Sequence, residues 1–233
     1  MDATKAKEIL DKIVGQVFGY QNPFTLEQFM AKYAFDVRLP QGVYDATTNK
    51  PTWAQSTNPT KFITMQNAWN RDTNGPGWGV PKRPLNNLED VLAAWSEINF
   101  TATEREIDST NVAESDNTYF SQNVFRSLDV HGSKNVLFSD AAIDSEFVVA
   151  TQRSNTSSFC IRLEDSQRCS NSFSVSWSDS ITNSFFIQDC KDMQDCMFCS
   201  HMSGKQFCIA NMQFEEAEYR KLKDIIVRWI LTA

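Results

Sequence analysis

Apolar positions recur every twelve residues between residues 98 and 212. Four asparagine–apolar pairs mark the repeat, at Asn99-Phe100, Asn111-Val112, Asn123-Val124 and Asn135-Val136. The apolar position then continues at Phe147, Phe159, Phe173, Phe185, Met197 and Phe207. Two-helix repeats need about 33 to 47 residues per unit, whereas twelve residues suffice for one coil of a narrow β-solenoid. We therefore predict a mainly β fold, a parallel β-solenoid of about ten twelve-residue coils.

The local pattern inside the repeat is that of a strand. Residues 172–177 alternate polar and apolar side chains, which is typical of a half-buried strand. After Val136 the repeat spacing varies between 10 and 14 residues, so we expect coils of unequal length. The repeated asparagines predict a ladder of side-chain hydrogen bonds that runs from coil to coil.

The residues on either side of the repeat follow helical patterns. Helices are predicted at residues 3–18 after the N-cap Asp2, at 26–33 after Thr25, from Asn86 to about Trp95, and from Phe214 onward. Residues 38–84 are rich in Pro, Asn, Gly, Thr and Trp, which predicts a long irregular loop held on a surface by its aromatic side chains. We expect the flanking helices to cap the two ends of the solenoid, or the last one to fold back along its side.

These patterns divide the chain into an N-terminal helical and aromatic-loop capping region (1–97), the β-solenoid (98–212) and a C-terminal amphipathic helix (213–233). The net charge of −7 falls entirely within the solenoid segment. An acidic protein with a pI near 4.9 is a poor partner for nucleic acid or an anionic membrane. We find no run of apolar residues long enough to span a bilayer and no apolar N-terminal signal, so we expect a cytoplasmic or virion-associated protein.

All of the cysteines also lie in the solenoid segment, at Cys160, Cys169, Cys190, Cys196, Cys199 and Cys208. Cys196 and Cys199 form a CxxC pair, and with Cys190, His201 and Cys208 they are candidates for a thiolate site for a metal such as zinc. Because side chains alternate along a strand, we expect Cys196 and Cys199 to face opposite sides. Buried reduced thiols are therefore the favoured interpretation, and we assign no metal.

Catalytic chemistry has little support in the sequence. The GxSxG, Walker A and GxGxxG motifs are absent, so we assign no catalytic residue and no cofactor. The alternative is a carbohydrate-active parallel β-helix enzyme, whose paired carboxylates would stand on adjacent coils. The candidate acids for that function are Asp129, Asp140 and Asp144, or Asp179, Asp189, Asp192 and Asp195.

Large apolar side chains also occupy positions that the alternation predicts to face outward. They are Phe125, Leu137, Val148, Phe186 and Phe198, with Cys160 and Cys208 in the same row. Such a stripe is too large for an ordinary monomer surface, so it must be covered by the N-terminal region, by the last helix or by another protein. Trp229, near the end of that helix, extends the candidate interaction surface.

The C-terminal third of the chain resembles a known family of uncharacterised repeat proteins. The resemblance lies in the segment from Cys196 to Phe214, above all Cys208-Ile-Ala-Asn-Met-Gln-Phe214, and in Tyr219 after it. The family consists of Cys-, Asn- and Phe-rich β-solenoid proteins of candidate-phylum bacteria with reduced genomes. Many members carry an N-terminal zinc-ribbon-like cysteine cluster, which this chain lacks. The resemblance implies a solenoid and brings no established activity.

Together these patterns predict a non-catalytic structural or interaction module. We expect a protein partner or a homo-oligomer, as in a bacterial intracellular scaffold or a virion component. The carbohydrate-active enzyme and a thiolate metal-binding protein are the alternatives.

Overall fold

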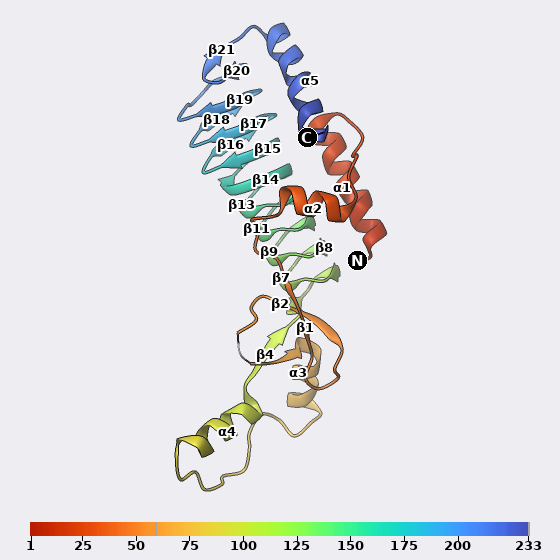
Figure 1. Ribbon diagram of the computed structural model, residues 1–233, viewed down its shortest axis with the longest axis vertical. Helices are drawn as coiled ribbons and strands as arrows, with labels where there is room; N and C mark the ends of the chain where they lie inside the picture. The colour runs from red at the N-terminus through yellow and green to blue at the C-terminus, as the bar shows by residue number, and fades with distance from the viewer. Residues whose placement is uncertain (59, 233) are drawn as a thin grey trace.

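The molecule is elongated, and its long axis is the axis of a parallel β-solenoid (Figure 1). The computed structural model describes residues 1–58 and 60–232. It is mainly β, with about nine solenoid coils, helices before them and a helix after them. The predicted fold class is therefore confirmed, with slightly fewer coils than expected. None of the helices in the described part of the chain has both the length and the apolar character needed to cross a membrane.

The helices are α1 (Ala3–Phe18), α2 (Leu26–Tyr33), α3 (Met65–Thr73), α4 (Leu88–Ile98) and α5 (Glu216–Thr232). The strands before the solenoid are β1 (Gln41–Tyr44), β2 (Pro51–Ala54), β3 (Lys61–Thr64) and β4 (Phe100–Thr103). The solenoid strands are β5 (Glu106–Ile107), β6 (Thr110–Ala113), β7 (Asp116–Tyr119), β8 (Gln122–Phe125), β9 (Leu128–His131), β10 (Lys134–Leu137), β11 (Asp140–Ile143), β12 (Glu146–Val149), β13 (Gln152–Asn155), β14 (Ser158–Gln167), β15 (Ser170–Ser176), β16 (Asp179–Thr182), β17 (Phe185–Gln188), β18 (Lys191–Gln194), β19 (Met197–Ser200), β20 (Cys208–Ile209) and β21 (Met212–Gln213).

Successive coils pair in parallel at a constant interval of twelve residues. Val136 pairs with Val148, and Val148 pairs with Cys160, so the valine column continues through Val148. The expectation of unequal coils is therefore wrong. It arose because Phe147 and Phe159 form a second apolar column one residue away, which the sequence pattern does not separate from the first.

Within each coil the side chains follow a period of three. Every third residue from Asp108 to Ala210 has a positive φ, so the backbone turns in the left-handed region at each of these positions. Residues that face the interior are consequently three apart, and Val124, Ser127 and Val130 are all fully buried. The predicted two-residue alternation is wrong. Each group of three residues has two in extended conformation and one in the left-handed region, so side chains return to the same face every three residues.

Buried serines hold one coil to the next. The hydroxyl of Ser127 donates to the carbonyl of Phe125 at 2.9 Å and accepts from the backbone N–H of Ser139, one coil later, at 3.1 Å. The same arrangement recurs in the second half of the solenoid, where Ser178 accepts from the N–H of Cys190 at 3.0 Å. These bonds satisfy polar groups that twelve-residue coils leave inside the solenoid.

The predicted asparagine ladder is confirmed. The side-chain amide of Asn111 donates to Asn123 at 2.6 Å, and that of Asn123 donates to Asn135 at 2.8 Å. The next two positions in the column are Phe147 and Phe159, whose rings stack with centroids 4.6 Å apart. Each ladder position has a positive φ, and contact between identical or similar side chains stabilises this uncommon backbone conformation.

Helices α1, α2 and α5 lie along one outer side of the solenoid (Figure 1). They cover an apolar column on that side, which consists of Phe125, Leu137, Val149, Ile161, Phe173, Phe185 and Met197. Hydrogen bonds from Tyr33 Oη and Lys32 Nζ to the carbonyl of Ile230, at 2.7 and 3.0 Å, join α2 to α5. Helix α5 therefore folds back along the side, which is one of the two predicted arrangements, and α1 and α2 lie along the side rather than over an end.

The segment between α2 and α4 is more ordered than the loop that its composition predicts. It forms the antiparallel β1–β2 pair, β3, which pairs with β4, and helix α3. Asp45 joins these pieces, because its buried carboxylate accepts hydrogen bonds from Thr47, Thr64 and Asn67. Burial favours a higher pKa for Asp45, but these bonds outweigh it and hold the pKa well below its usual value.

Ion pairs attach this segment to the first coils. The guanidinium of Arg38 bridges two acids on neighbouring coils, at 2.8 Å to Asp129 and 2.9 Å to Asp140. Arg105 binds the buried carboxylate of Asp116 with two bonds of 3.0 and 2.8 Å, and the backbone N–H of Gln55 donates to the same carboxylate. The N-terminal third therefore joins the solenoid through specific polar contacts.

Candidate functional site

The structure divides the predicted interaction stripe into three environments. Phe125 and Leu137 face outward but lie buried beneath the helices. Val148 belongs to the interior cluster and is fully buried, as are Cys160 and Cys208 of the same row, so the prediction that these three face outward is wrong. The period of three explains the error. With this period, the residues of the predicted stripe belong to different columns and therefore lie on different sides of the solenoid. The remaining members, Phe186, Phe198 and Trp229, stay together at the surface.

These three aromatic side chains form one edge of an apolar groove between α2, α5 and the solenoid. Phe186 and Phe198 stack with ring centroids 4.5 Å apart, and Phe186 lies 6.1 Å from Trp229. Phe186 and Trp229 line a cavity of about 290 Å³ together with Phe35 and Phe173, and Phe198 extends the surface beyond it. We call this surface the aromatic groove. About half of the Trp229 side chain and 42% of Phe198 are exposed.

A second apolar surface lies on α4. Its large apolar side chains are Leu88, Val91, Leu92 and Trp95, which are between 45 and 66% exposed. None of the α4 residues is buried, so this face has no partner within the described chain. The helix begins at the N-cap Asn87, one residue later than predicted, and a bond from Arg83 to Glu97 spans it. The spacing i, i+3, i+4, i+7 of these four side chains can be read from the sequence. Their exposure can be read only from the tertiary structure.

The cysteine candidates do not gather with a histidine. All six cysteines are free and buried, which confirms the expected reduced thiols. Cys190, Cys196 and Cys199 belong to the interior cluster, whereas the His201 side chain is 75% exposed. Cys196 and Cys199 both face the interior, and the expectation of opposite faces is wrong because they are three residues apart. In residues 1–58 and 60–232, no group of three or more His, Cys, Asp or Glu side chains could hold a metal ion.

Burial suppresses the reactivity of two of these thiols. It raises the pKa of Cys169 to about 12, and it raises the pKa of Cys160 further. The hydrogen bond between the two CxxC thiols raises the pKa of Cys196, as burial also does, and it lowers the pKa of Cys199. Because a metal or nucleophilic site needs thiolates, the environment of Cys160 and Cys169 favours a packing role.

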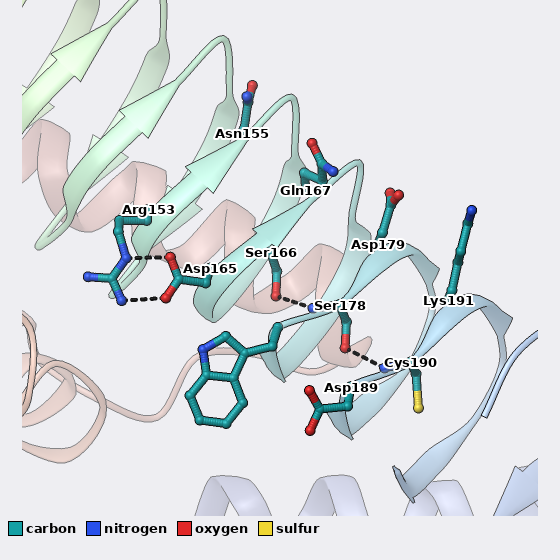
Figure 2. Close-up of a pocket in the computed structure, with 11 residues that line it drawn as sticks. Arg153, Asn155, Asp165, Ser166, Gln167, Ser178, Asp179, Asp189, Cys190 and Lys191 are labelled. Carbon is teal, nitrogen blue, oxygen red and sulfur yellow. Dashed lines mark hydrogen bonds and ion pairs between the residues drawn. The ribbon is translucent and has the colours of Figure 1, made fainter. Parts of the chain in front are cut away.

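A third feature is a shallow polar trough on another side of the solenoid, shown in Figure 2. One bank is a column with a twelve-residue spacing that consists of Arg153, Asp165, Trp177 and Asp189. The other bank is the column of Asn155, Gln167, Asp179 and Lys191, and Ser166, Ser178 and Cys190 lie between them. The trough has a volume of about 600 Å³. The Trp177 side chain lies in the trough and is half exposed. The sequence pattern did not single out this residue.

The candidate catalytic acids are mostly engaged with cations. Arg38 bridges Asp129 and Asp140, Arg168 pairs with Asp179, and Lys223 lies 4.0 Å from Asp195. In the trough itself, the bond from Arg153 lowers the pKa of Asp165. A glycosidase requires one carboxyl whose pKa is raised so that it can act as an acid. The lowered pKa makes Asp165 unsuited to the role of that acid.

Comparison of the chain with protein-family models, with curated proteins and with solved structures finds no match. The class of the protein is thus defined by its own fold, a parallel β-solenoid of twelve-residue coils with helices along one side. Its candidate functional features are the aromatic groove, the exposed face of α4 and the polar trough around Trp177.

Proposed function

We propose that the protein is a non-catalytic interaction module that assembles head to tail. Helix α4 of one copy would bind the aromatic groove of the next copy. The observation that carries this proposal is the presence of two uncovered apolar surfaces, one convex and one concave, on a rigid rod. Exposed apolar area of this extent on a soluble chain marks an interaction site.

The α4 face has the form of a groove-binding helix. Leu88, Val91, Leu92 and Trp95 occupy the i, i+3, i+4 and i+7 positions that anchor amphipathic helices in apolar grooves. A helix of 11 residues is marginal on its own. Because α4 buries no side chain within its own molecule, docking would supply the packing that it lacks.

The charges of the two surfaces are complementary. Helix α4 carries Glu89 and Asp90 in its first turn. The charged residues that line the cavity of the aromatic groove are the cations Lys32 and Arg162, of which Arg162 is also paired with Asp36 at 2.9 Å. Opposite charges at the rim of an apolar contact favour the correct orientation and speed association.

The positions of the two surfaces favour contact between different molecules. Figure 1 shows α4 at one end of the long axis, whereas α5 lies well along the solenoid toward the other end. Trp229 belongs to α5. A copy therefore cannot fill its own groove without a large rearrangement. A contact between two different surfaces leaves one of each free on every dimer, so it builds open chains rather than closed dimers. Such chains would suit a scaffold.

The experiment is light scattering with mass determination on two complementary variants. Wild-type protein should grow in mass with concentration beyond a dimer. The double variant Leu92→Asp/Trp95→Asp blocks α4, and Trp229→Asp blocks the groove, so each should be monomeric alone. Mixed in equal amounts, the two variants retain one intact pair of surfaces and should form a heterodimer that does not extend.

A matched control is Trp69→Asp, which changes an exposed tryptophan on α3 outside both surfaces. This variant should assemble like the wild type. A wild-type protein that stays monomeric at every concentration would refute the proposal. A mixture of the two blocked variants that stays monomeric, with each variant folded by circular dichroism, would refute the pairing of α4 with the groove.

A further inference from the structure

The polar trough around Trp177 shares no lining residue with the aromatic groove. Its two banks repeat every twelve residues, so equivalent side chains on successive coils stand about 4.8 Å apart. The columns from Arg153 to Asp189 and from Asn155 to Lys191 each span four coils, which gives the trough a length of about 14 Å. This shape suits an extended ligand that lies parallel to the solenoid axis.

The lining combines one flat aromatic surface with both donors and acceptors. Trp177 stands between Asp165 and Asp189 in the twelve-residue column of its bank. Gln167 and Lys191 are exposed on the opposite bank, and neither side chain has a hydrogen-bond partner in the described part of the chain. The hydroxyl of Ser178 is already used by the backbone of the solenoid, so the groups left for a ligand are those of the two banks.

The formal charges in and beside the trough sum to zero. Arg153 pairs with Asp165 and Arg168 pairs with Asp179. The charge of Lys191 on one bank offsets that of Asp189 on the other, and His201, whose Nδ1 lies 3.8 Å from Asp189, is charged only when protonated. A cationic ligand over Trp177 would need uncompensated carboxylates, and an anionic ligand would meet three aspartates. A ligand without net charge meets neither obstacle.

From these observations we infer that the trough binds a neutral linear oligosaccharide lengthwise, with one sugar ring stacked on Trp177. A pyranose ring presents C–H groups on its flat face, which pack on an aromatic ring, and hydroxyls around its rim that both donate and accept. Apolar stacking with a few convergent polar groups is the usual composition of a small-ligand site. Gln167 and Asn155 would supply amide donors and acceptors, and Asp189 would supply an acceptor.

Isothermal titration with cellohexaose, maltohexaose and chitohexaose tests the inference on the full-length protein. We expect at least one of them to bind, and to bind more tightly than its disaccharide because the trough spans four coils. The variant Trp177→Ala should weaken binding about tenfold or more, as loss of an aromatic stacking platform does elsewhere. Trp177→Phe should retain part of the affinity, and Gln167→Ala should weaken binding several-fold.

The control variant is Trp229→Ala, which removes an equally exposed tryptophan on α5 and should leave sugar binding unchanged. Binding should also persist in Leu92→Asp/Trp95→Asp, so failure of assembly and failure of sugar binding are separable. The inference is overturned if none of the three hexasaccharides binds at millimolar concentration, or if binding is unaffected by Trp177→Ala. It is also overturned if a lysine tetrapeptide binds more tightly than every sugar and competes at Trp177.

Discussion

Phe186 and Phe198 stack face to face across one coil, with ring centroids 4.5 Å apart and planes at 8°. Their chain neighbours Phe185 and Met197 form an equivalent pair that is fully buried beneath the helices. Two adjacent columns of large apolar residues therefore differ in exposure. Phe185 and Met197 belong to the core under the helices, whereas Phe186 and Phe198 form the open wall of the aromatic groove.

This difference predicts different costs for truncating the two columns. Phe198→Ala should reduce the free energy of unfolding by only about 0.5–1.5 kcal/mol, the value of an aromatic pair. Phe185→Ala should reduce it by about 3–5 kcal/mol, because it leaves a cavity under α1 and α5. Urea unfolding monitored by circular dichroism measures both. Equal costs would contradict the assignment of Phe198 to an open surface.

The interior serines should be intolerant of small changes. In Ser127→Ala the N–H of Ser139 loses its acceptor inside the solenoid, so we expect a loss of about 1–3 kcal/mol in unfolding free energy. Ser127→Cys should cost less, because Cys190 at a comparable interior position donates to the carbonyl two residues earlier. The exposed Ser203 provides a control, and Ser203→Ala should be close to neutral. If the two alanine variants are equally stable, the serine contacts do not hold the coils together.

The buried ion pair between Arg105 and Asp116 should control the stability of the first coils. Only 1% of the Asp116 side chain is exposed. Its removal takes the carboxylate partner from Arg105 and leaves the backbone N–H groups of Gln55, Arg105 and Asn117 without this acceptor. Asp116→Ala should therefore destabilise the protein by about 3–5 kcal/mol. Hydrogen exchange should show the loss concentrated around β5 to β7. Asp108→Asn, which removes an exposed charge in the same region and suits the positive φ at that position, should change neither quantity appreciably.

The buried thiols should make the protein sensitive to alkali. Because burial raises the pKa of Cys169 to about 12, the unfolded chain loses this proton first as pH rises. The stabilising contribution of the neutral thiol is complete below about pH 8.5, the usual thiol pKa. It declines by about 1.4 kcal/mol per pH unit above that value, until the pH reaches the folded pKa.

Cys169→Ser tests this effect with little disturbance, since serines occupy the same column at Ser145 and Ser157. Unfolding free energies measured between pH 7 and pH 10 should show a shallower decline in the variant than in the wild type. Identical slopes would mean that Cys169 is ionised or exposed in the folded protein.

Much of the architecture can be predicted from particular residues. Asp2 and Thr25 are N-caps in the structure, and the capping box of Thr25 and Gln28 is present as their spacing predicts. The asparagines at positions 111, 123 and 135 predict both the coil length and the ladder. These features depend on contacts between residues close in sequence or one repeat apart, so a one-dimensional pattern contains them.

The candidate sites were less accessible to prediction. Cys196 and Cys199 share the interior because the chain turns at every third residue. Between Asp108 and Ala210 glycine occupies just two of those turn positions, Gly132 and Gly204, so the sequence does not mark the turns. Trp177 was not singled out because only the folded columns place it beside Asp165 and Asp189. The exposure of Leu92 and Trp95 depends on where α4 lies relative to the rest of the molecule.

The sequence by itself determined that twelve residues make one coil, that the coils stack in parallel, and that helices flank them. The reason is that each coil repeats the same local interactions with its neighbour. Only the tertiary structure decided which sides of the solenoid the helices cover. That choice depends on contacts between distant segments, such as the hydrogen bond between Tyr33 and Ile230. A local sequence repeat contains no information about such contacts. It is this packing that leaves the aromatic groove and the Trp177 trough open.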